Sequence, residues 1–272
     1  MKAPKNKTKQ KSPLPPLAKG KQPLQDVKTR LTLAFIVGIV GFLLYSNTFS
    51  HGYVLDDFSA VKENNIIRQG VSAIPEIFRT SYRQGYLSIK DGLYRPLSLA
   101  TYAIEWDCFP DQPGVSHFVN VLLYGITGFL LFLMLCKFSP SAQHPPSPLQ
   151  RGNLQPTTEG RRQEVFAFVA ALLFIAHPLH VEVVANIKSR DEILCFLFVI
   201  CSFLFVFKYL ESGNKKYVGF GIAAYFLSLL SKETSITFLA VLPLALHFFS
   251  STTIKLSLIH ISEPTRLRRI SY

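Results

Sequence analysis

The residues with the clearest chemical potential are Asp56 and Asp57, which follow the apolar pair Val54-Leu55 and precede Phe58. Two adjacent carboxylates can bind a divalent cation or take a proton from a hydroxyl group. One of them could instead cap a helix that begins near Phe58, because Asp is a preferred N-cap residue. A cap explains one carboxylate more easily than two, so the pair is our first candidate site and the cap is its alternative.

Basic side chains occur in three other polar motifs of the chain. These are Arg95 in Tyr-Arg-Pro-Leu, Lys188 and Arg190 in Lys-Ser-Arg-Asp-Glu, and Lys232 in Ser-Lys-Glu-Thr. Each of them can neutralise a phosphate through charge-assisted hydrogen bonds. For Arg95 and residues 188–192 the alternative is a solvated loop with local ion pairs that contribute little stability.

Lys232 and Glu233 lie in a short gap between two apolar blocks. Charges at membrane depth are costly, so they usually face a cavity or each other. The alternative is a hairpin tip in water. Both interpretations of this pair stay open at the level of the sequence.

The run His177-Pro178-Leu179-His180-Val181-Glu182 follows an apolar block. Its two histidines and its glutamate are metal-ligand types, but the spacing lacks the i, i+4 pair of a helical zinc site. The alternative is a helix that ends at proline, with polar residues at the membrane interface. Because histidine also suits phosphate binding or the orientation of an acceptor, we predict a substrate-binding role for His177 and His180 and assign no metal site.

Six apolar blocks must position these motifs, and the chain is 49% hydrophobic. Blocks approaching about 20 apolar residues with few charges indicate membrane helices. The sequence therefore predicts an all-α, polytopic membrane protein with about six transmembrane helices. They are expected at residues 31–47, 117–137, 165–176, 193–210, 217–230 and 234–249.

The net charge of +12 is concentrated in the N-terminal tail, where residues 1–30 hold nine cations and one acid. Such a tail could bind nucleic acid, but before a membrane helix it favours a cytoplasmic N-terminus. We predict a disordered cytoplasmic tail and no nucleic-acid partner. The low-complexity residues 138–163 are then a cytoplasmic linker, and the membrane domain covers residues 31–250.

Under this topology residues 48–116 form a large external loop. Apolar residues recur with helical spacing in 57–67 and 74–82, which predicts helices lying flat on the membrane surface. Their interfacial face would consist of Phe58, Ile66, Ile67, Ile77, Phe78 and Tyr82. The four polar clusters described above all fall on this external side, at the ends of different helices.

The final residues, 256–272, contain Leu-Ser-Leu-Ile-His-Ile-Ser-Glu-Pro-Thr-Arg. This run resembles the translation of a sequencing-library adapter. We expect these residues to be a non-native tail and exclude them from the prediction of the fold. The natural protein is then expected to continue beyond Lys255.

Taken together, the motifs resemble the family of transmembrane and tetratricopeptide-repeat-containing proteins. The resemblance covers residues 31–250 and rests on the order of five motifs. They are Val54-Leu55-Asp56-Asp57, Tyr94-Arg95-Pro96-Leu97, His117-Phe118-Val119-Asn120, the run from His177 to Glu182, and Ser231-Lys232-Glu233-Thr234. That family is similar to membrane glycosyltransferases with the C-type fold, including protein O-mannosyltransferases.

The resemblance implies transfer of a sugar from a polyprenyl-phosphate donor in the bilayer to a Ser or Thr hydroxyl of an acceptor protein. Asp56 or Asp57 would be the general base, and Glu182 would orient the acceptor. The lipid phosphate would be stabilised by cations from the set Arg95, Lys188, Arg190 and Lys232, with Glu233 beside them. Several members of this enzyme group need no tightly bound metal, so a divalent cation is a candidate cofactor that we do not assign.

Two other functions compete with this interpretation. A non-catalytic membrane anchor for tetratricopeptide repeats would not need the carboxylate pair, and no 34-residue repeat is found in residues 1–255. A transporter would place ionisable groups in the middle of its helices, whereas these apolar blocks are nearly free of charge. We therefore favour the enzyme, expect this fragment to be inactive by itself, and expect a bacterial inner membrane rather than an endoplasmic reticulum.

Overall fold

A computed structural model describes residues 24–88, 92–138 and 156–249. Within these ranges the chain is helical and contains no strand. The predicted tail up to residue 23, residues 139–155 of the predicted linker and the adapter-like residues 256–272 lie outside the described residues. The all-α prediction is confirmed for the part of the chain that the structure describes.

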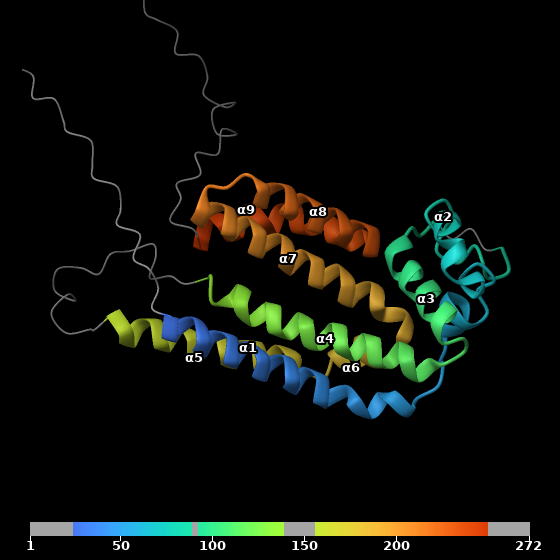
Figure 1. The fold of residues 1–272 in the computed structure, drawn as a ribbon, viewed down its shortest axis with the longest axis horizontal. Helices are drawn as coiled ribbons and strands as arrows, with labels where there is room; N and C mark the ends of the chain where they lie inside the picture. The colour runs from blue at the N-terminus through green and yellow to red at the C-terminus, as the bar shows by residue number, and fades with distance from the viewer. Residues whose placement is uncertain (1–23, 89–91, 139–155, 250–272) are drawn as a thin grey trace, which may run out of the picture.

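Six helices run alongside one another and form the body of the molecule (Figure 1). They are α1 (Leu24–Tyr45), α4 (Pro113–Leu135), α5 (Pro156–Ile175), α7 (Arg190–Ser212), α8 (Lys216–Ser231) and α9 (Phe238–Phe249). The first three pack together, α7 packs on α8, and α4 contacts α7 to join the two groups. Each group has its own core of buried apolar side chains.

In the part of the chain that the structure describes, three helices are long and apolar enough to cross a bilayer, at Val27–Ser50, Pro113–Leu135 and Ile187–Ser212. Helices α8 and α9 are also apolar but have 16 and 12 residues. At 1.5 Å per residue a 16-residue helix rises about 24 Å, which is less than the about 30 Å of a hydrocarbon core. The membrane character is supported, while the number of six spans stays a prediction.

The largest differences from the helix boundaries expected from the sequence are at the starts of α1 and α5. Helix α1 begins at Leu24 rather than at residue 31, so Lys28 and Arg30 belong to it. Helix α5 begins at Pro156, within the stretch expected to be a linker, and proline is favoured in the first turn of a helix. In both cases polar residues extend the helix beyond the apolar block that revealed it.

Short helices carry the chain between these long ones. They are η1 (Ser46–Ser50), η2 (Phe58–Lys62), η3 (Ile67–Ala73), α2 (Ile74–Ile77), α3 (Pro96–Cys108), α6 (His180–Ala185), η5 (Ile187–Ser189) and η6 (Glu233–Thr237). We call residues 51–112 the head. It sits at one end of the long helices (Figure 1).

The head has a core of its own, and this corrects the prediction of an interfacial face. Ile66, Ile67, Ile77 and Tyr82 are buried against Tyr102 and its neighbours. The sequence reasoning did not identify α3, the 13-residue helix that carries Tyr102 and covers these side chains. The two stretches are helical only in part, and four of the six expected interfacial residues face the core of the head. Phe58 is partly buried, and Phe78 is 39% exposed.

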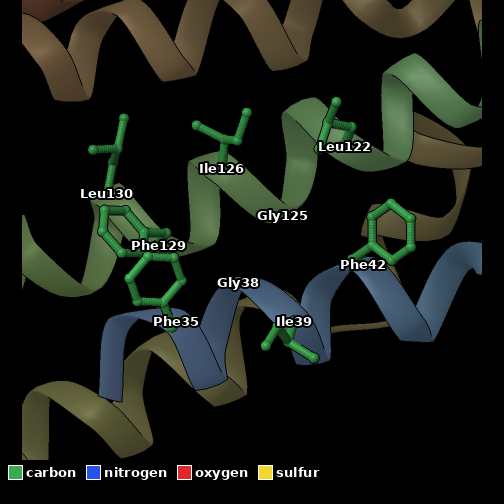
Figure 2. A pocket seen from close by; sticks show the side chains of 9 residues that line it. All are labelled: Phe35, Gly38, Ile39, Phe42, Leu122, Gly125, Ile126, Phe129 and Leu130. Atoms are coloured by element: carbon green, nitrogen blue, oxygen red, sulfur yellow. The ribbon is translucent and has the colours of Figure 1, made fainter. Parts of the chain in front are cut away.

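Helices α1 and α4 cross at two glycines that allow their backbones to touch. A Cβ atom on Gly125 would lie 2.9 Å from the backbone oxygen of Gly38, and one on Gly38 would lie 3.0 Å from that of Gly125. Figure 2 shows the two glycines facing each other, with Phe35, Phe42 and Phe129 beside them around an apolar groove. Small residues commonly allow this close approach in membrane helices.

This contact gives a prediction with a matched control. Gly125→Ala should lower the free energy of unfolding by about 1–3 kcal/mol, because the backbones must separate. Gly219→Ala on α8, where a Cβ meets no atom within 4 Å, should leave it unchanged or raise it by up to about 1 kcal/mol. Thermal unfolding of the purified protein in detergent measures both, and an equal effect of the two changes would contradict the proposed crossing.

Candidate functional site

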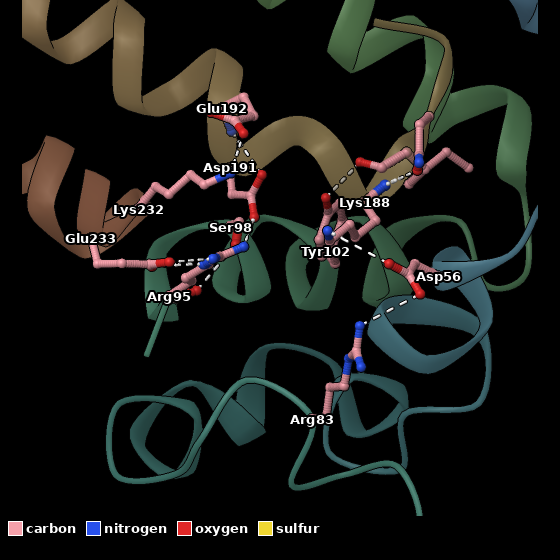
Figure 3. Close-up of polar contacts among 12 residues, drawn as sticks. Asp56, Arg83, Arg95, Ser98, Tyr102, Lys188, Asp191, Glu192, Lys232 and Glu233 are labelled. Carbon is pink, nitrogen blue, oxygen red and sulfur yellow. Dashed lines mark hydrogen bonds and ion pairs between the residues drawn. The ribbon is translucent and has the colours of Figure 1, made fainter. Parts of the chain in front are cut away.

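The sequence-predicted charges meet where the head rests on the ends of the long helices. Figure 3 shows acidic and basic side chains from the head, from the start of α7 and from η6 lying next to one another. The ion pairs join residues up to 138 positions apart in the chain. The structure therefore brings together most of the charged motifs that the sequence suggested.

Asp57 is fully buried and has a structural role in this arrangement. Its Oδ1 accepts a hydrogen bond from the backbone N–H of Lys188 at 2.8 Å, and its Oδ2 accepts one from Val54 at 3.0 Å. It makes no side-chain cap bond to η2, so the helix-cap alternative is wrong for Asp57. Burial raises the pKa of Asp57, and the two backbone donors oppose that increase.

Asp56 is the accessible member of the pair, with 49% of its side chain exposed. Its Oδ1 lies 3.5 Å from Nη2 of Arg83, and its Oδ2 lies 3.6 Å from Nζ of Lys188 (Figure 3). The two carboxylates therefore differ in what they can do. Asp56 can meet a substrate, while Asp57 connects the start of the head to the segment before α7.

Arg95 is held by two acids and is nearly buried. Its Nη1 donates to Asp191 at 2.6 Å, and its Nε and Nη2 donate to Glu233. The hydrogen bond from Arg95 lowers the pKa of Glu233 below its usual value. The solvated-loop alternative is wrong for Arg95, because this side chain links the start of α3 to α7 and η6.

Arg190 is, like Asp57, a completely buried charged residue of the described chain. Its guanidinium donates two hydrogen bonds to Glu105, and one each to Asn120 at 2.7 Å, Thr101 at 3.0 Å and the backbone oxygen of Ser116 at 3.0 Å. These bonds use all five of its N–H donors. Arg190 is 0% exposed, so it is not a solvated residue and has no donor left for a phosphate.

The pair Lys232-Glu233 is also tied to other elements. Lys232 forms an ion pair with Glu192 of α7, and Glu233 forms one with Arg95. The alternative of a free hairpin tip in water is therefore wrong. Of the four predicted phosphate ligands, Lys188 and Lys232 keep part of their side chains exposed, at 22% and 14%.

Within the described residues neither histidine contacts Asp56. His180 lines a groove of about 320 Å³, whereas His177 is exposed and does not line it. His180 contacts the hydroxyl of Tyr124 through Nδ1 at 2.7 Å, and burial lowers its pKa. Nδ1 of His177 accepts the backbone N–H of Leu179 at 3.3 Å. The lining of the groove includes the polar residues His180, Glu192 and Thr234 and the aromatic residues Phe174, Phe196 and Phe238.

Glu182 is exposed on α6, and within the described ranges nothing pairs it with the Asp56 group. The described residues also contain no group of three His, Cys, Asp or Glu side chains suited to a metal ion. At Asp56 the nearest charged partners are cations rather than further acids. The chemistry that this arrangement offers is acid–base chemistry next to lysine and arginine.

Several residues of the arrangement were missed in the sequence reasoning. Arg83, Glu105 and Asn120 hold Asp56 and Arg190 in place, and Asp191 neutralises Arg95. A usable signal exists for Glu105 and Asp191, since each is an acid within or beside an apolar helix. The partner of each acid could not be read from the sequence.

Comparison with curated proteins identifies relatives of this chain. Protein O-mannosyl-transferase TMTC4 of Mus musculus is 31% identical over 188 residues, which are 66% of this chain and 24% of that protein. The relatives reported for this chain are named protein O-mannosyl-transferases of the TMTC family. Tmtc3 of Drosophila melanogaster is 28% identical over 59% of this chain and 17% of its own length, and TMTC2 of Homo sapiens is 29% identical over 74% and 22%. These relatives confirm the resemblance read from the motifs.

The chain spans about a quarter of the length of the relative with 31% identity. No protein-family model and no solved structure matches it. The relatives named above come from mouse, human and fruit fly, so they lend no support to the expected bacterial inner membrane.

The different roles of the two aspartates can be separated by stability. In Asp57→Asn the new side chain keeps one oxygen as an acceptor but replaces the other with an NH₂ group, which is a donor. One of the two buried backbone N–H groups therefore loses its acceptor. The free energy of unfolding should fall by about 1–3 kcal/mol. Asp56→Asn should change it by no more than about 1 kcal/mol, because its ion pairs are half-exposed. Unfolding in detergent tests this, and equal losses would disprove the division of roles.

The Arg95–Glu233 pair should make stability depend on pH. A carboxyl group with a lowered pKa stabilises the fold above its unfolded-state pKa of about 4.5, and this contribution is lost as the pH falls through the lower folded-state pKa. Glu233→Gln should therefore flatten the decline of the melting temperature below about pH 4.5. The measurement is a series of melting curves at different pH values. If the melting temperature falls equally in Glu233→Gln and in the unchanged protein, the contribution of the Arg95–Glu233 pair is refuted.

Proposed function

We propose that this chain is part of a membrane glycosyltransferase that moves a sugar from a polyprenyl-phosphate donor to Ser or Thr hydroxyls of an acceptor protein. The proposal is supported by relatives that are named protein O-mannosyl-transferases, which makes mannose the expected sugar. Because the chain spans about a quarter of such a relative, the activity is proposed for the whole protein.

The observation that carries the proposal is the half-exposed carboxylate of Asp56 beside two cations. In the proposed step Asp56 takes the proton of the acceptor hydroxyl, and the oxygen of that hydroxyl bonds to the anomeric carbon of the sugar. The bond between that carbon and the phosphate oxygen breaks, and the lipid phosphate leaves with the electron pair. Asp57 supports this step by holding the segment around Asp56 in place.

The leaving phosphate needs nearby positive charge. Of the four candidate phosphate ligands, those with exposed side chains are the better suited to this role. We assign this role to Lys188, whose ammonium lies 3.6 Å from Asp56, and to Lys232, next to the groove residue Glu192. Arg95 and Arg190 position the elements that carry these lysines. The aromatic residues that line the groove suit the polyprenyl chain of the donor, and His180 is among the polar residues that line it.

The proposed setting is a bilayer crossed by the six long helices as the first part of a C-type glycosyltransferase bundle. The head then lies on the external side, where an acceptor protein would meet Asp56. This orientation is supported by the basic residues at the opposite ends of the helices, among them Lys137, Lys208, Lys215 and Lys216.

The proposal predicts the effect of one substitution in the full-length protein. Asp56→Asn should lower sugar transfer at least about 100-fold, because a general base typically contributes that factor or more. Asp111→Asn, which also removes an exposed acid of the head, should leave transfer unchanged. Transfer is measured with a polyprenyl-phosphate mannose donor and an acceptor polypeptide.

Melting temperatures of both variants provide the control for folding. If Asp56→Asn leaves transfer intact, the catalytic role of Asp56 is refuted. The membrane-anchor alternative then replaces the enzyme for this part of the protein.

A further inference from the structure

A second pocket lies at the end of the helices opposite the head. It has a volume of about 450 Å³ and is formed by the start of α1, the end of α4, the end of α7 and the start of α8. Figure 1 shows that this end is separated from the head by the length of the long helices. The pocket therefore shares no residue with the Asp56 site and has no part in the proposed transfer.

The rim of this pocket is basic. Its lining includes Arg30, Lys137 and Lys208, against Glu211 as the only acid in the lining. Lys137 forms an ion pair with Glu211 at 2.5 Å, and Arg30 forms one with Glu164. Lys208 is exposed, and among the residues described here no carboxylate pairs with it. Within the described ranges a positive charge without a counter-ion thus remains at the rim.

The remaining lining of the pocket is mainly apolar. Leu31, Leu133, Leu204 and Phe205 supply side chains on the membrane side of the cations. A ligand that fits must therefore carry negative charge at one end and hydrocarbon at the other. An anion without a chain would leave the apolar walls uncovered, and a neutral hydrocarbon would leave Lys208 unmatched.

We propose that this pocket binds one phospholipid with an anionic head group from the cytoplasmic leaflet. The head-group phosphate accepts hydrogen bonds from the ammonium groups of Lys208 and Lys137, and an acyl chain covers Leu133, Leu204 and Phe205. Basic pockets between membrane helices on the cytoplasmic side bind such head groups in general. The site goes beyond the proposed function and takes from it only the orientation that puts this end of the helices on the cytoplasmic side.

The test uses the full chain in detergent micelles and native mass spectrometry, with phosphatidylserine and phosphatidylcholine as probes. Phosphatidylserine should bind more tightly than phosphatidylcholine. Lys208→Gln should weaken phosphatidylserine binding about fivefold, and Lys208→Glu about 25-fold, since one basic residue near a membrane contributes about a factor of five. Neither change removes an ion pair within the described residues, so the fold should be kept.

The matched control is Lys215→Gln and Lys215→Glu. Lys215 is exposed at the same end of the molecule but does not line the pocket. These variants should change binding less than twofold. Equal losses for Lys208 and Lys215 would show general attraction to a basic surface, and equal binding of the two lipids would show that the head-group charge is not recognised. Either result overturns the proposal.

Discussion

The burial of Arg190 is the constraint on which the rest of the structure depends. A guanidinium that is 0% exposed must be neutralised and hydrogen-bonded, because an unpaired buried charge costs several kcal/mol. Glu105 of α3, Asn120 of α4 and the backbone of Ser116 meet this requirement together. One side chain at the start of α7 thus determines how the head sits on two of the long helices.

The neighbouring charges follow from the same requirement. Arg95 is neutralised by Asp191 and Glu233, and Lys232 by Glu192, so α3, α7 and η6 are held in one arrangement. Asp57 has no cationic partner of its own in this layer and is satisfied by two backbone donors. Removal of one partner from such a layer costs more than its hydrogen bonds alone, because the other partner stays buried.

Within this network, the residues that position the helices differ from those that a substrate could reach. Arg190 has no donor left for a ligand, and Arg95 is held by two acids and is 6% exposed. Asp56, Lys188 and Lys232, by contrast, lie at the edge of the layer with part of their side chains exposed. A general base needs both access to its substrate and a fixed position. The layer holds Asp56 in place and leaves 49% of its side chain exposed, as the proposed role of general base requires. The lipid pocket at the other end lacks such a network and presents a mobile type of side chain, lysine, over apolar walls.

The sequence by itself determined the all-helical membrane character, the approximate place of the long helices and the motifs that carry the charges. It could do so because a membrane helix satisfies its backbone locally and is marked by a continuous apolar block. Only the tertiary structure decided that Asp57 is buried and Asp56 exposed, that Arg190 meets Glu105, and that α3 covers Ile67 and Tyr82. These outcomes depend on contacts between residues far apart in the chain, and neighbouring residues of one type carry no local signal of which will be buried.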